Sequence, residues 1–344
     1  MSVGLIPRNR LKWIPKRWRL AHSYCFFLHD ECLRALVEYE AAGAHLVTIN
    51  FESQVSTEEF SRLTKENPIE ALVKTGYPAE ARQVVINTII IGMVSDCLHH
   101  IFEALQCFEK PKVVVGFNLL RKPLKQNLLY LAWMLGNEDG FYTEFMSGNP
   151  ENLSQKKVGN QRQEIFTNAI AKMPKGSPFI PEILEKLIYD RKFDYGFERA
   201  FEHAVHLITI ERLELRTASQ NFNFIFKNYA DDDTYDALYS WAPYLLFFLA
   251  HAILGLFDRM RNMEGGVKTA FAVRSLFAFT LLEGGAGKKA TLKELNRMLS
   301  AVACDRCKAP LKVTFHNAGR ILLTDSFRCA TCRRKNLLAV SWAF

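Results

Sequence analysis

Apolar residues recur every three or four positions along most of this chain, which is the spacing of one face of an α-helix. Residues 24–42 follow this spacing, and Gly43 supplies a stop signal. Two longer helical patterns cover 78–110 and 113–135, and Pro123 should kink or restart the second one. The pattern therefore predicts a mostly α fold with a multi-helix body.

Shorter helices are expected between and after these. Ser56, three residues before Glu59, has the arrangement of a capping box, and Asn67-Pro68 is a second helix start. Turn-forming and polar residues predict short helices joined by loops over 146–182. Further helical patterns cover 181–189, 197–207, the stretch after the acidic residues 231–233, 266–282 and 291–301, and a loop is expected over 218–233.

One helical stretch has the character of a membrane span. Residues 239–257 carry no formal charge and precede Arg259 and Arg261. A span with those arginines in the cytoplasm would require the whole preceding chain to cross the membrane, and the N-terminal residues show no secretory signal. We therefore interpret this stretch as a buried core helix, and we expect a cytoplasmic protein without a membrane partner.

The pattern changes near the C-terminus. Residues 311–315 alternate in the manner of a strand, 316–320 are turn-forming, and 321–324 can return as a second strand. A third strand is expected within 336–342. The glycine-rich residues 283–290 lack the spacing of a phosphate-binding loop, so they predict a flexible hinge.

Composition adds a large core and an uneven charge to this picture. The 344 residues are 49% hydrophobic and 12% aromatic, which excludes disorder for most of the chain. The formal net charge is +8. Residues 1–20 carry six Lys or Arg and no acid, and residues 301–344 carry eight against two acids. Such clusters favour polyanions, meaning nucleic acid, an anionic membrane surface or an acidic protein.

The strongest chemical signal is a pair of CxxC motifs. They consist of Cys304, Cys307, Cys329 and Cys332. Each motif can place two thiolates at corners of a tetrahedron around Zn²⁺, and four protein ligands leave no position for a reactive water. A redox or disulfide pair is the alternative, and His316 is a substitute ligand that we expect to face solvent. The other cysteines lie singly in apolar helical patterns, which predicts inert thiols. They are Cys25, Cys32, Cys97 and Cys107.

Residues 303–344 resemble the zinc-ribbon family, in which two cysteine knuckles are joined by a β-hairpin. The resemblance implies a structural Zn²⁺ whose binding supplies the free energy to fold so small a module. Cations and aromatic rings near the knuckles have the chemistry of a nucleic-acid surface. The basic candidates are Arg306, Lys308, Lys312, Arg320, Arg328, Arg333, Arg334 and Lys335. Phe327 is a nearby aromatic ring, whereas Phe315 and Trp342 are expected in a miniature core.

Two stretches of the body, 119–135 and 204–226, look like stretches of uncharacterised bacterial helical proteins. The helical body as a whole resembles the HEPN group, whose members are often dimeric ribonucleases. The resemblance implies an Arg and, a few residues later, a His that act on RNA without a metal. Arg199 and His206 have this spacing. Glu202 either orients the imidazole or forms only a surface pair with it.

Two further sets of residues have spacings of chemical interest. Arg17 and His22 also match the HEPN spacing. Asp96, His99 and Glu103 share one helix face, beside His100, so a metal or acid–base role is one interpretation. The default interpretation is a polar seam between packed helices, because metal sites in helical bundles need matching carboxylates on facing helices.

These patterns divide the chain into four expected parts. They are a basic N-terminal arm at 1–20, an all-helical body at 21–288, a linking helix at 289–302 and a zinc ribbon at 303–344. The leading hypothesis is a cytoplasmic zinc-ribbon protein that binds nucleic acid, with RNA expected, in bacterial antiviral defence. One alternative is a HEPN-like ribonuclease with the ribbon as its targeting module. The other is an adaptor that docks a protein partner, and a homo-oligomer stays open.

Overall fold

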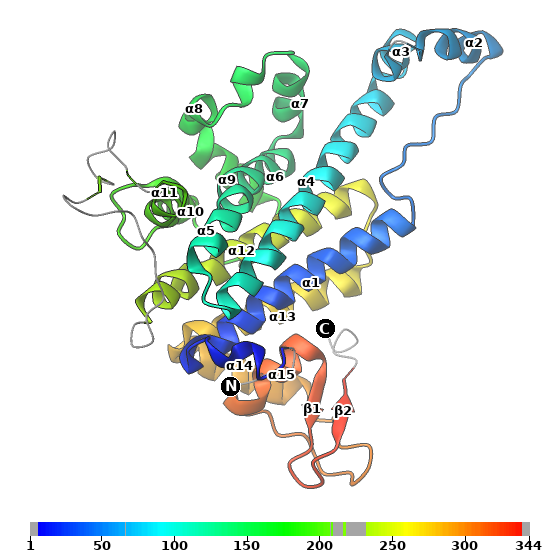
Figure 1. Cartoon of the computed structure of the whole chain (residues 1–344). Helices are drawn as coiled ribbons and strands as arrows, with labels where there is room; N and C mark the ends of the chain where they lie inside the picture. The colour runs from blue at the N-terminus through cyan, green and yellow to red at the C-terminus, as the bar shows by residue number, and fades with distance from the viewer. Residues whose placement is uncertain (1–5, 66, 207, 209–215, 218–231, 339–344) are drawn as a thin grey trace.

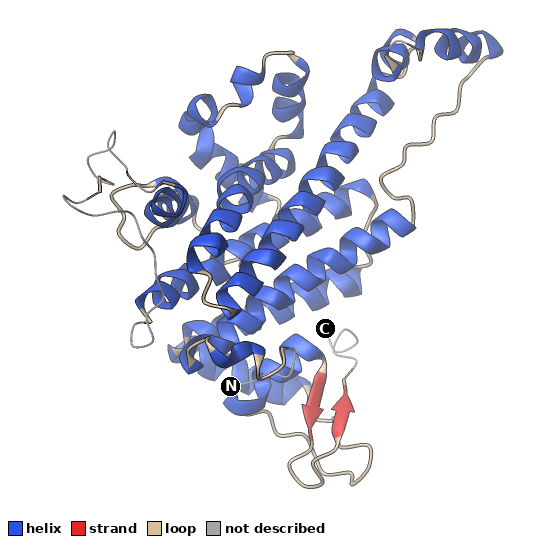
Figure 2. Ribbon diagram, viewed as in Figure 1, coloured by secondary structure: helices blue, strands red, loops and turns tan. Residues whose placement is uncertain are grey.

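Helices dominate the structure, as the periodicity predicts (Figure 1, Figure 2). The computed structural model describes residues 6–338 except 66, 207, 209–215 and 218–231. The expected loop at 218–233 therefore lies almost entirely outside the described residues. So do Trp342 and most of the strand expected within 336–342.

The helices and strands have the following bounds, in chain order. The α-helices are α1 (Arg19–Ala41), α2 (Gln54–Leu63), α3 (Pro68–Lys74), α4 (Pro78–Glu109), α5 (Val113–Lys122), α6 (Leu128–Gly136), α7 (Glu138–Met146), α8 (Gln155–Val158), α9 (Arg162–Ala171), α10 (Pro181–Tyr189), α11 (Phe197–Val205), α12 (Asp233–Met260), α13 (Gly265–Glu283), α14 (Gly285–Met298) and α15 (Phe315–Thr324). Short 3-10 turns cover Arg10–Lys12, Lys16–Trp18, Pro150–Leu153 and Gly159–Gln161. The strands β1 (Ser326–Arg328) and β2 (Lys335–Leu337) pair antiparallel, with Phe327 opposite Asn336.

The long helices α1, α4 and α12 pack against one another at the centre of the molecule (Figure 1). Residues 242–253 of α12 are all buried, which explains why its sequence is apolar on every side. Among the described residues, α4, α12 and α13 are long and apolar enough to cross a membrane. In the most apolar window of α12, 78% of the residues are buried inside the protein, against 39% in α4 and in α13. The interpretation of 239–257 as a core helix is therefore confirmed.

Most predicted helix starts are confirmed, but one is displaced. Asn67 caps α3, since its side chain accepts from the N–H of Glu70 at 3.2 Å and Pro68 follows it. The capping box expected to begin at Ser56 begins at Ser53, and Ser56 closes it. Both positions carry the same hydroxyl, so the sequence alone did not distinguish them.

Pro123 interrupts the regular hydrogen bonding between α5 and α6, as expected. Proline has no N–H to donate, and the chain passes the gap through a π-helical turn at Pro123–Asn127. Asn127, at the end of this turn, donates from its side-chain amide to Asp96 of α4 at 2.9 Å. The irregular turn therefore contributes a polar contact between two helices of the core.

The β-hairpin expected between the two cysteine motifs is wrong. Thr314 caps a helix there, α15, and Asn317 closes the capping box. The helix buries Ile321 and Leu322 and packs against α1 and α13. The short apolar run 321–323 suits a buried helix as well as a strand, so the packing against the body decided its structure.

The flexible hinge expected at 283–290 is also replaced by regular structure. Gly284 and Gly285 have φ of +79° and +58°, a region that glycine enters without steric strain. They turn the chain from α13 directly into α14, whose first turns contain 286–290. The helix expected from about residue 291 therefore begins at Gly285.

Candidate metal centre

The two CxxC motifs fold into knuckles with the same backbone hydrogen bonds. In each, the N–H of the first cysteine donates to the C=O five residues later at 2.9 Å. The N–H four residues later donates back to that cysteine, at 2.9 Å in the first knuckle and 3.1 Å in the second. The residue after each motif, Lys308 or Arg333, has φ of +57° or +62°. This shared turn brings both sulfurs of a knuckle to one side.

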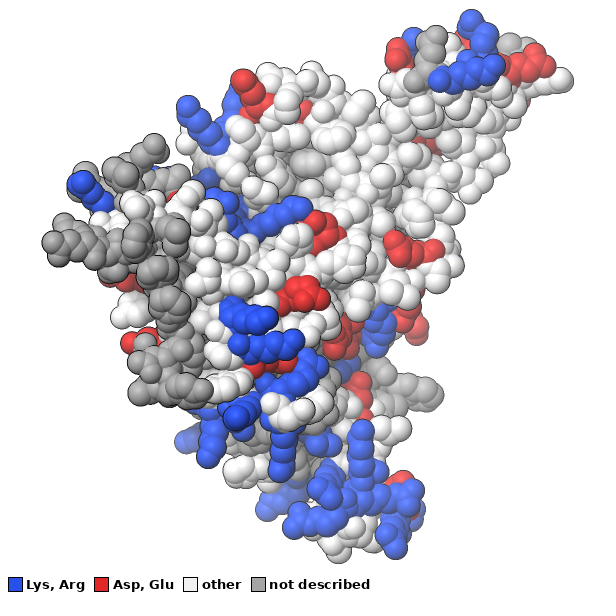
Figure 3. Space-filling model, viewed as in Figure 1, with Lys and Arg blue, Asp and Glu red and all other residues white. Residues whose placement is uncertain are grey.

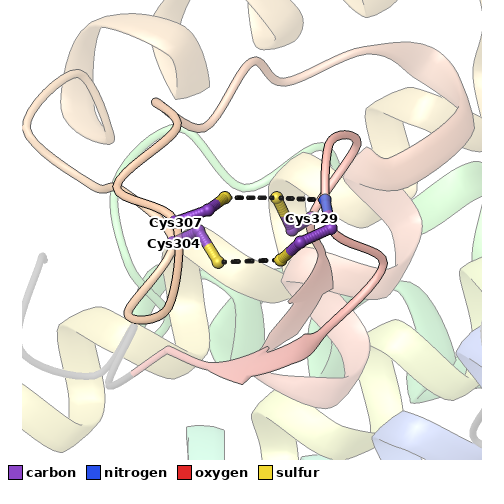
Figure 4. Close-up of side chains that lie close together, drawn as sticks. Cys304, Cys307 and Cys329 are labelled. Atoms are coloured by element: carbon purple, nitrogen blue, oxygen red, sulfur yellow. Dashed lines mark hydrogen bonds between the residues drawn. The ribbon is translucent and has the colours of Figure 1, made fainter.

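The four sulfurs lie together between the knuckles (Figure 4). Cys304 Sγ is 3.6 Å from Cys332 Sγ, and Cys307 Sγ is 3.6 Å from Cys329 Sγ. All four lie within 4.8 Å of one another, and no other group of this kind exists among the described residues. Tetrahedral Zn²⁺ with bonds of about 2.3 Å separates its sulfurs by about 3.8 Å, whereas a disulfide needs about 2.0 Å. The cysteines are therefore positioned to bind a metal ion, and the geometry is compatible with structural zinc.

Backbone N–H groups tune the thiols for metal binding. The N–H of Cys332 lies 3.5 Å from Cys329 Sγ and, with that of the preceding residue, lowers the pKa of Cys329 to about 6. The N–H of Cys307 likewise lowers the pKa of Cys304. The Ala309 backbone lowers the pKa of Cys307, but partial desolvation and the three neighbouring sulfurs together outweigh it, so this pKa rises to about 11. Four thiolates this close repel one another, and a divalent cation offsets that repulsion.

Asn336 joins the two knuckles, a role that no pattern in the sequence indicates. Its buried side-chain oxygen accepts from the N–H of Asp305 in the first knuckle at 3.0 Å. Its nitrogen donates to Arg334 O in the second knuckle at 3.1 Å. An ion pair between Arg334 Nε and Asp305 Oδ2 at 3.4 Å spans the same gap at the surface. These contacts hold the ligand loops at metal-binding distance.

Arg274 of α13 docks the cysteine module, residues 303–338, onto the helical body. Its buried guanidinium donates to Leu322 O at 2.9 Å. It also lies 3.2 Å from Asp325 of the module and 3.4 Å from Glu31 of α1. A buried charge is tolerated only when it is paired and hydrogen-bonded, and here it has both kinds of partner. This docking explains a charged residue on the buried face of α13.

A second contact fixes the chain between the first knuckle and α15. The side chain of Asn296 on α14 accepts from Val313 N–H at 2.9 Å and donates to Val313 O at 2.9 Å. It thus bonds both backbone groups of one residue, as a neighbouring strand would. Val313 and the buried face of α15 belong to the same hydrophobic core as the body. The module is therefore packed into the molecule.

Most basic residues expected to bind nucleic acid surround the cysteines and are exposed. The exposed ones are Arg306, Lys308, Lys312, Arg328, Arg333, Arg334 and Lys335. Arg320 is half-buried. Arg334 has its ion pair, and Arg328 Nε donates to the backbone oxygen of Arg333 at 2.9 Å. The others have no ion-pair partner among the described residues.

The aromatic residues of the module do not form a stacking surface. Phe327 is only 2% exposed and belongs to the core. Phe315 is half-buried, and Lys288 Nζ of α14 lies 3.1 Å from its ring centroid. His316 is exposed, as expected, but it lies on α15 and not in a hairpin turn. Within residues 303–338, the exposed surface therefore presents cations and no exposed phenylalanine.

The described part of the basic N-terminal arm, residues 6–18, forms an N-terminal segment that lies on the body. Its residues Leu11 and Ile14 are each 1% exposed within the core. Arg10 donates to both carboxylate oxygens of buried Glu109, at 2.6 and 2.8 Å. Arg17 donates to both oxygens of Asp236 on α12, at 2.7 and 2.8 Å. Two of its cations are thereby neutralised by the body.

His22, which matches the HEPN spacing with Arg17, is fully buried beside this segment. Its Nε2 lies 3.1 Å from Glu109 Oε1, and its Nδ1 lies 2.6 Å from the hydroxyl of Tyr239. Burial lowers the pKa of His22, although the Glu109 carboxylate opposes this. The histidine therefore belongs to a buried polar network between α1, α4 and α12.

Arg199 and His206 lie at the two ends of α11 and are both exposed. Arg199 Nη1 is 3.4 Å from Asp194 Oδ1. His206 Nε2 is 3.7 Å from Glu202 Oε2, so the two side chains approach one another as the spacing suggested. Glu202 is buried and also lies 3.7 Å from Arg121. The catalytic role of the pair stays a prediction.

Of the polar set on α4, only Asp96 contacts the neighbouring helix α5, so the polar seam of the default interpretation is confined to that residue. Asp96 Oδ1 accepts from Lys122 Nζ of α5 at 2.7 Å. His100 Nδ1 bonds the backbone oxygen of Asp96 at 2.8 Å. His99 and Glu103 are exposed. This set is not among the groups that could hold a metal ion in the described part of the chain.

The remaining cysteines have the environment of structural thiols. Cys25, Cys32 and Cys97 are buried, and burial raises the pKa of each. Cys107 is partly exposed, and its pKa is raised as well. A raised pKa disfavours the thiolate, which is the reactive form. These residues contrast with the C-terminal four.

Known proteins give no guide to the function of this chain, so the function is inferred from the geometry of the site. No family model, curated protein or solved structure matches this chain. The HEPN resemblance therefore stays a prediction. Function is inferred from the cysteine cluster and the cations around it.

Proposed function

We propose that this protein binds nucleic acid through the cationic surface of the cysteine module. The observation that carries the proposal is the placement of exposed cations around the two knuckles. Lys and Arg gather at the end of the molecule that carries the N-terminal segment and the module (Figure 3). Lys289 and Lys293 of α14 add exposed positive charge beside the module. Clustered cations bind phosphate backbones by releasing condensed counterions.

Zinc would be the structural part of this surface. The strands of the module have three residues each, and the two knuckles contribute few buried side chains. Four cysteines would fill the coordination of Zn²⁺ and leave no position for water, so the ion would not act in catalysis. Its bonds would hold Lys308 and Arg333 on two rigid turns.

RNA is the form that we expect the surface to bind. A DNA major groove is read by an inserted helix or ribbon, and α15 presents its apolar face to the body. The module offers basic loops instead, which suit irregular or single-stranded RNA. The buried position of Phe327 makes phosphate contacts the main contribution.

Titration of a labelled single-stranded RNA at several salt concentrations tests the proposal. We expect the logarithm of the affinity to fall linearly with the logarithm of the salt concentration, by about 0.7 for each phosphate contact. Double-stranded RNA and single-stranded DNA of the same sequence test the preference for RNA. Absence of binding at low salt, or binding that ignores salt, contradicts the proposal. If the nuclease-treated protein captures an acidic protein and does not bind RNA, the adaptor function is favoured instead.

A further inference from the structure

Two adjoining cavities lie between the loop after α9 and the helices α12 and α13. Their volumes are about 280 and 170 Å³. Pro174, His251 and Ala272 line both of them. Small-molecule pockets begin at about 300 Å³, so the pair has the size of a site for a compact ligand. The cavities are separate from the cysteine module and from its basic surface.

His251 gives these cavities a hydrogen-bond acceptor. Its Nε2 lies 3.4 Å from Ser275 Oγ, and that hydroxyl donates to Phe271 O at 2.6 Å. Because the serine has a single proton, its oxygen is left to accept from Nε2–H, which places the lone pair of the ring on Nδ1. Burial lowers the pKa of His251 to about 4, so the ring is neutral at pH 7. Nδ1 has no hydrogen-bond partner among the described residues.

Apolar and aromatic side chains surround this acceptor. The rings of Phe247 and Phe271 have centroids 4.9 and 5.0 Å from that of His251. Leu254 and Met263 continue the wall of the larger cavity. His251 is only 7% exposed, so its polar atom lies in a site from which most water is excluded. A ligand donor would meet little competition from solvent there.

The rim of the cavities is cationic. Lys172 and Lys268 line the larger cavity, and Lys175 lines the smaller one. Among the described residues that line the cavities, Asp258 is the only acid, and Lys268 Nζ neutralises it at 3.1 Å. Lys172 and Lys175 are exposed and have no ion-pair partner within the described residues. Their two positive charges would attract an anionic group at the mouth.

The geometry points to a binding site for a small heteroaromatic acid that carries a ring N–H. The ring lies against Phe271 in the larger cavity, the N–H donates to His251 Nδ1, and the carboxylate faces Lys172, with Lys175 on the rim of the adjoining cavity. This site is independent of nucleic-acid binding, because it shares no residue with the cysteine module.

Calorimetric titration with two matched probes tests the site. Indole-3-acetate has the ring N–H, and 1-methylindole-3-acetate replaces that proton with a methyl group. We expect the full-length protein to bind the first about tenfold more tightly, as one hydrogen bond in a desolvated site would provide. In His251→Phe, which keeps an aromatic ring at the position, the two probes should bind equally.

Ala272→Leu provides a second variant, since it adds bulk to a wall shared by both cavities. It should abolish binding of both probes while circular dichroism shows the helical fold unchanged. No saturable binding of indole-3-acetate at millimolar concentration overturns the proposal. So does an unchanged preference for the N–H probe in His251→Phe, or unchanged binding in Ala272→Leu.

Discussion

The two ends of the chain are similar in charge and different in what the fold does with it. The N-terminal segment directs Arg10 and Arg17 at carboxylates of the body, and it buries apolar side chains beside them. The cysteine module directs most of its cations at solvent and uses one cation of the body, Arg274, to dock. The net charge of the N-terminal segment therefore overstates the positive surface that it offers to a polyanion.

The difference follows from how each end is stabilised. Residues 1–20 contain no Cys, His, Asp or Glu, and the N-terminal segment is held by burial and by ion pairs with Glu109 and Asp236. The module has four sulfurs that a metal can join, so its loops need few of their own charges for stability. A cation that stabilises the fold is not free to bind a phosphate.

Removal of a metal ligand should have the largest effect on this contrast. Cys329→Ser should abolish stoichiometric metal and expose the backbone of residues 303–338 to hydrogen exchange, because a structural ion supplies folding free energy. The N-terminal segment should stay protected. Elemental analysis and hydrogen-exchange mass spectrometry measure both. Cys107→Ser, outside the cluster, is the control, and metal loss in that variant or none in Cys329→Ser would contradict the assignment.

Paired substitutions at the two ends compare their cations directly. Arg306→Ala with Lys308→Ala should weaken RNA binding about tenfold or more and lower the salt slope by about 1.4, since two phosphate contacts are lost. Arg10→Ala with Arg17→Ala removes the same charge but should leave the salt slope unchanged. Equal effects of the two pairs on the slope would show that the N-terminal ion pairs open when RNA binds.

The N-terminal ion pairs should matter instead for stability. Glu109→Gln leaves Arg10 and His22 without a carboxylate partner in a largely buried site. We expect the free energy of unfolding to fall by about 2 kcal/mol, less than for a fully buried pair because Arg10 is partly exposed. Urea titration measures this change. Arg334→Gln, which breaks an exposed pair, is the matched control and should change stability by about 0.5 kcal/mol or less.

Acid should lower the stability of the N-terminal end through His22 and Glu109, independently of the metal site. Burial lowers the pKa of His22 below 6.5. As the pH falls through 6.5, this histidine therefore binds a proton in the unfolded chain before it does so in the folded chain. Stability contributed by this group is therefore lost as the pH falls below 6.5. For Glu109, burial raises the pKa, but hydrogen bonds from His22 and Arg10 outweigh it and the pKa is lowered below 4.5. Its contribution is lost below pH 4.5.

Urea titrations between pH 7 and pH 4 measure this dependence. His22→Phe should show a shallower fall between pH 6.5 and pH 5 than the natural chain, whatever its stability at pH 7. Other buried histidines such as His251 contribute with the same sign, so the slope decreases without vanishing. An unchanged slope in His22→Phe would show that this histidine does not titrate with unfolding.

The smallest effect concerns the backbone of the module. Arg333 has φ of +62°, which is strained for a residue with a side chain. Arg333→Gly should be more stable than Arg333→Ala by about 1 kcal/mol, while both variants lose the same charge and bind RNA equally weakly. Thermal unfolding with metal present compares them, and equal stability would contradict the role of the left-handed turn.

The local rules of the sequence account for much of the fold. Helical periodicity, the cap at Asn67 and the break at Pro123 are short-range effects, and the structure confirms each of them. The CxxC spacing likewise fixes each knuckle, because one tight turn needs only its own backbone. Two predictions were wrong. The short apolar run in α15 can form a strand or a helix, and the glycines at Gly285 can form a flexible hinge or a tight turn between helices.

By itself, the sequence determined a helical core and two cysteine knuckles, since both depend on residues close together in the chain. Only the tertiary structure decided which charges are neutralised, because Arg10, Arg17 and Arg274 find their carboxylates far away in the sequence. It also decided that Asn336 and Asn296 hold the module and that His251 faces two cavities. Pairing between distant segments leaves no local pattern, and burial, charge and cavity shape all arise from that pairing.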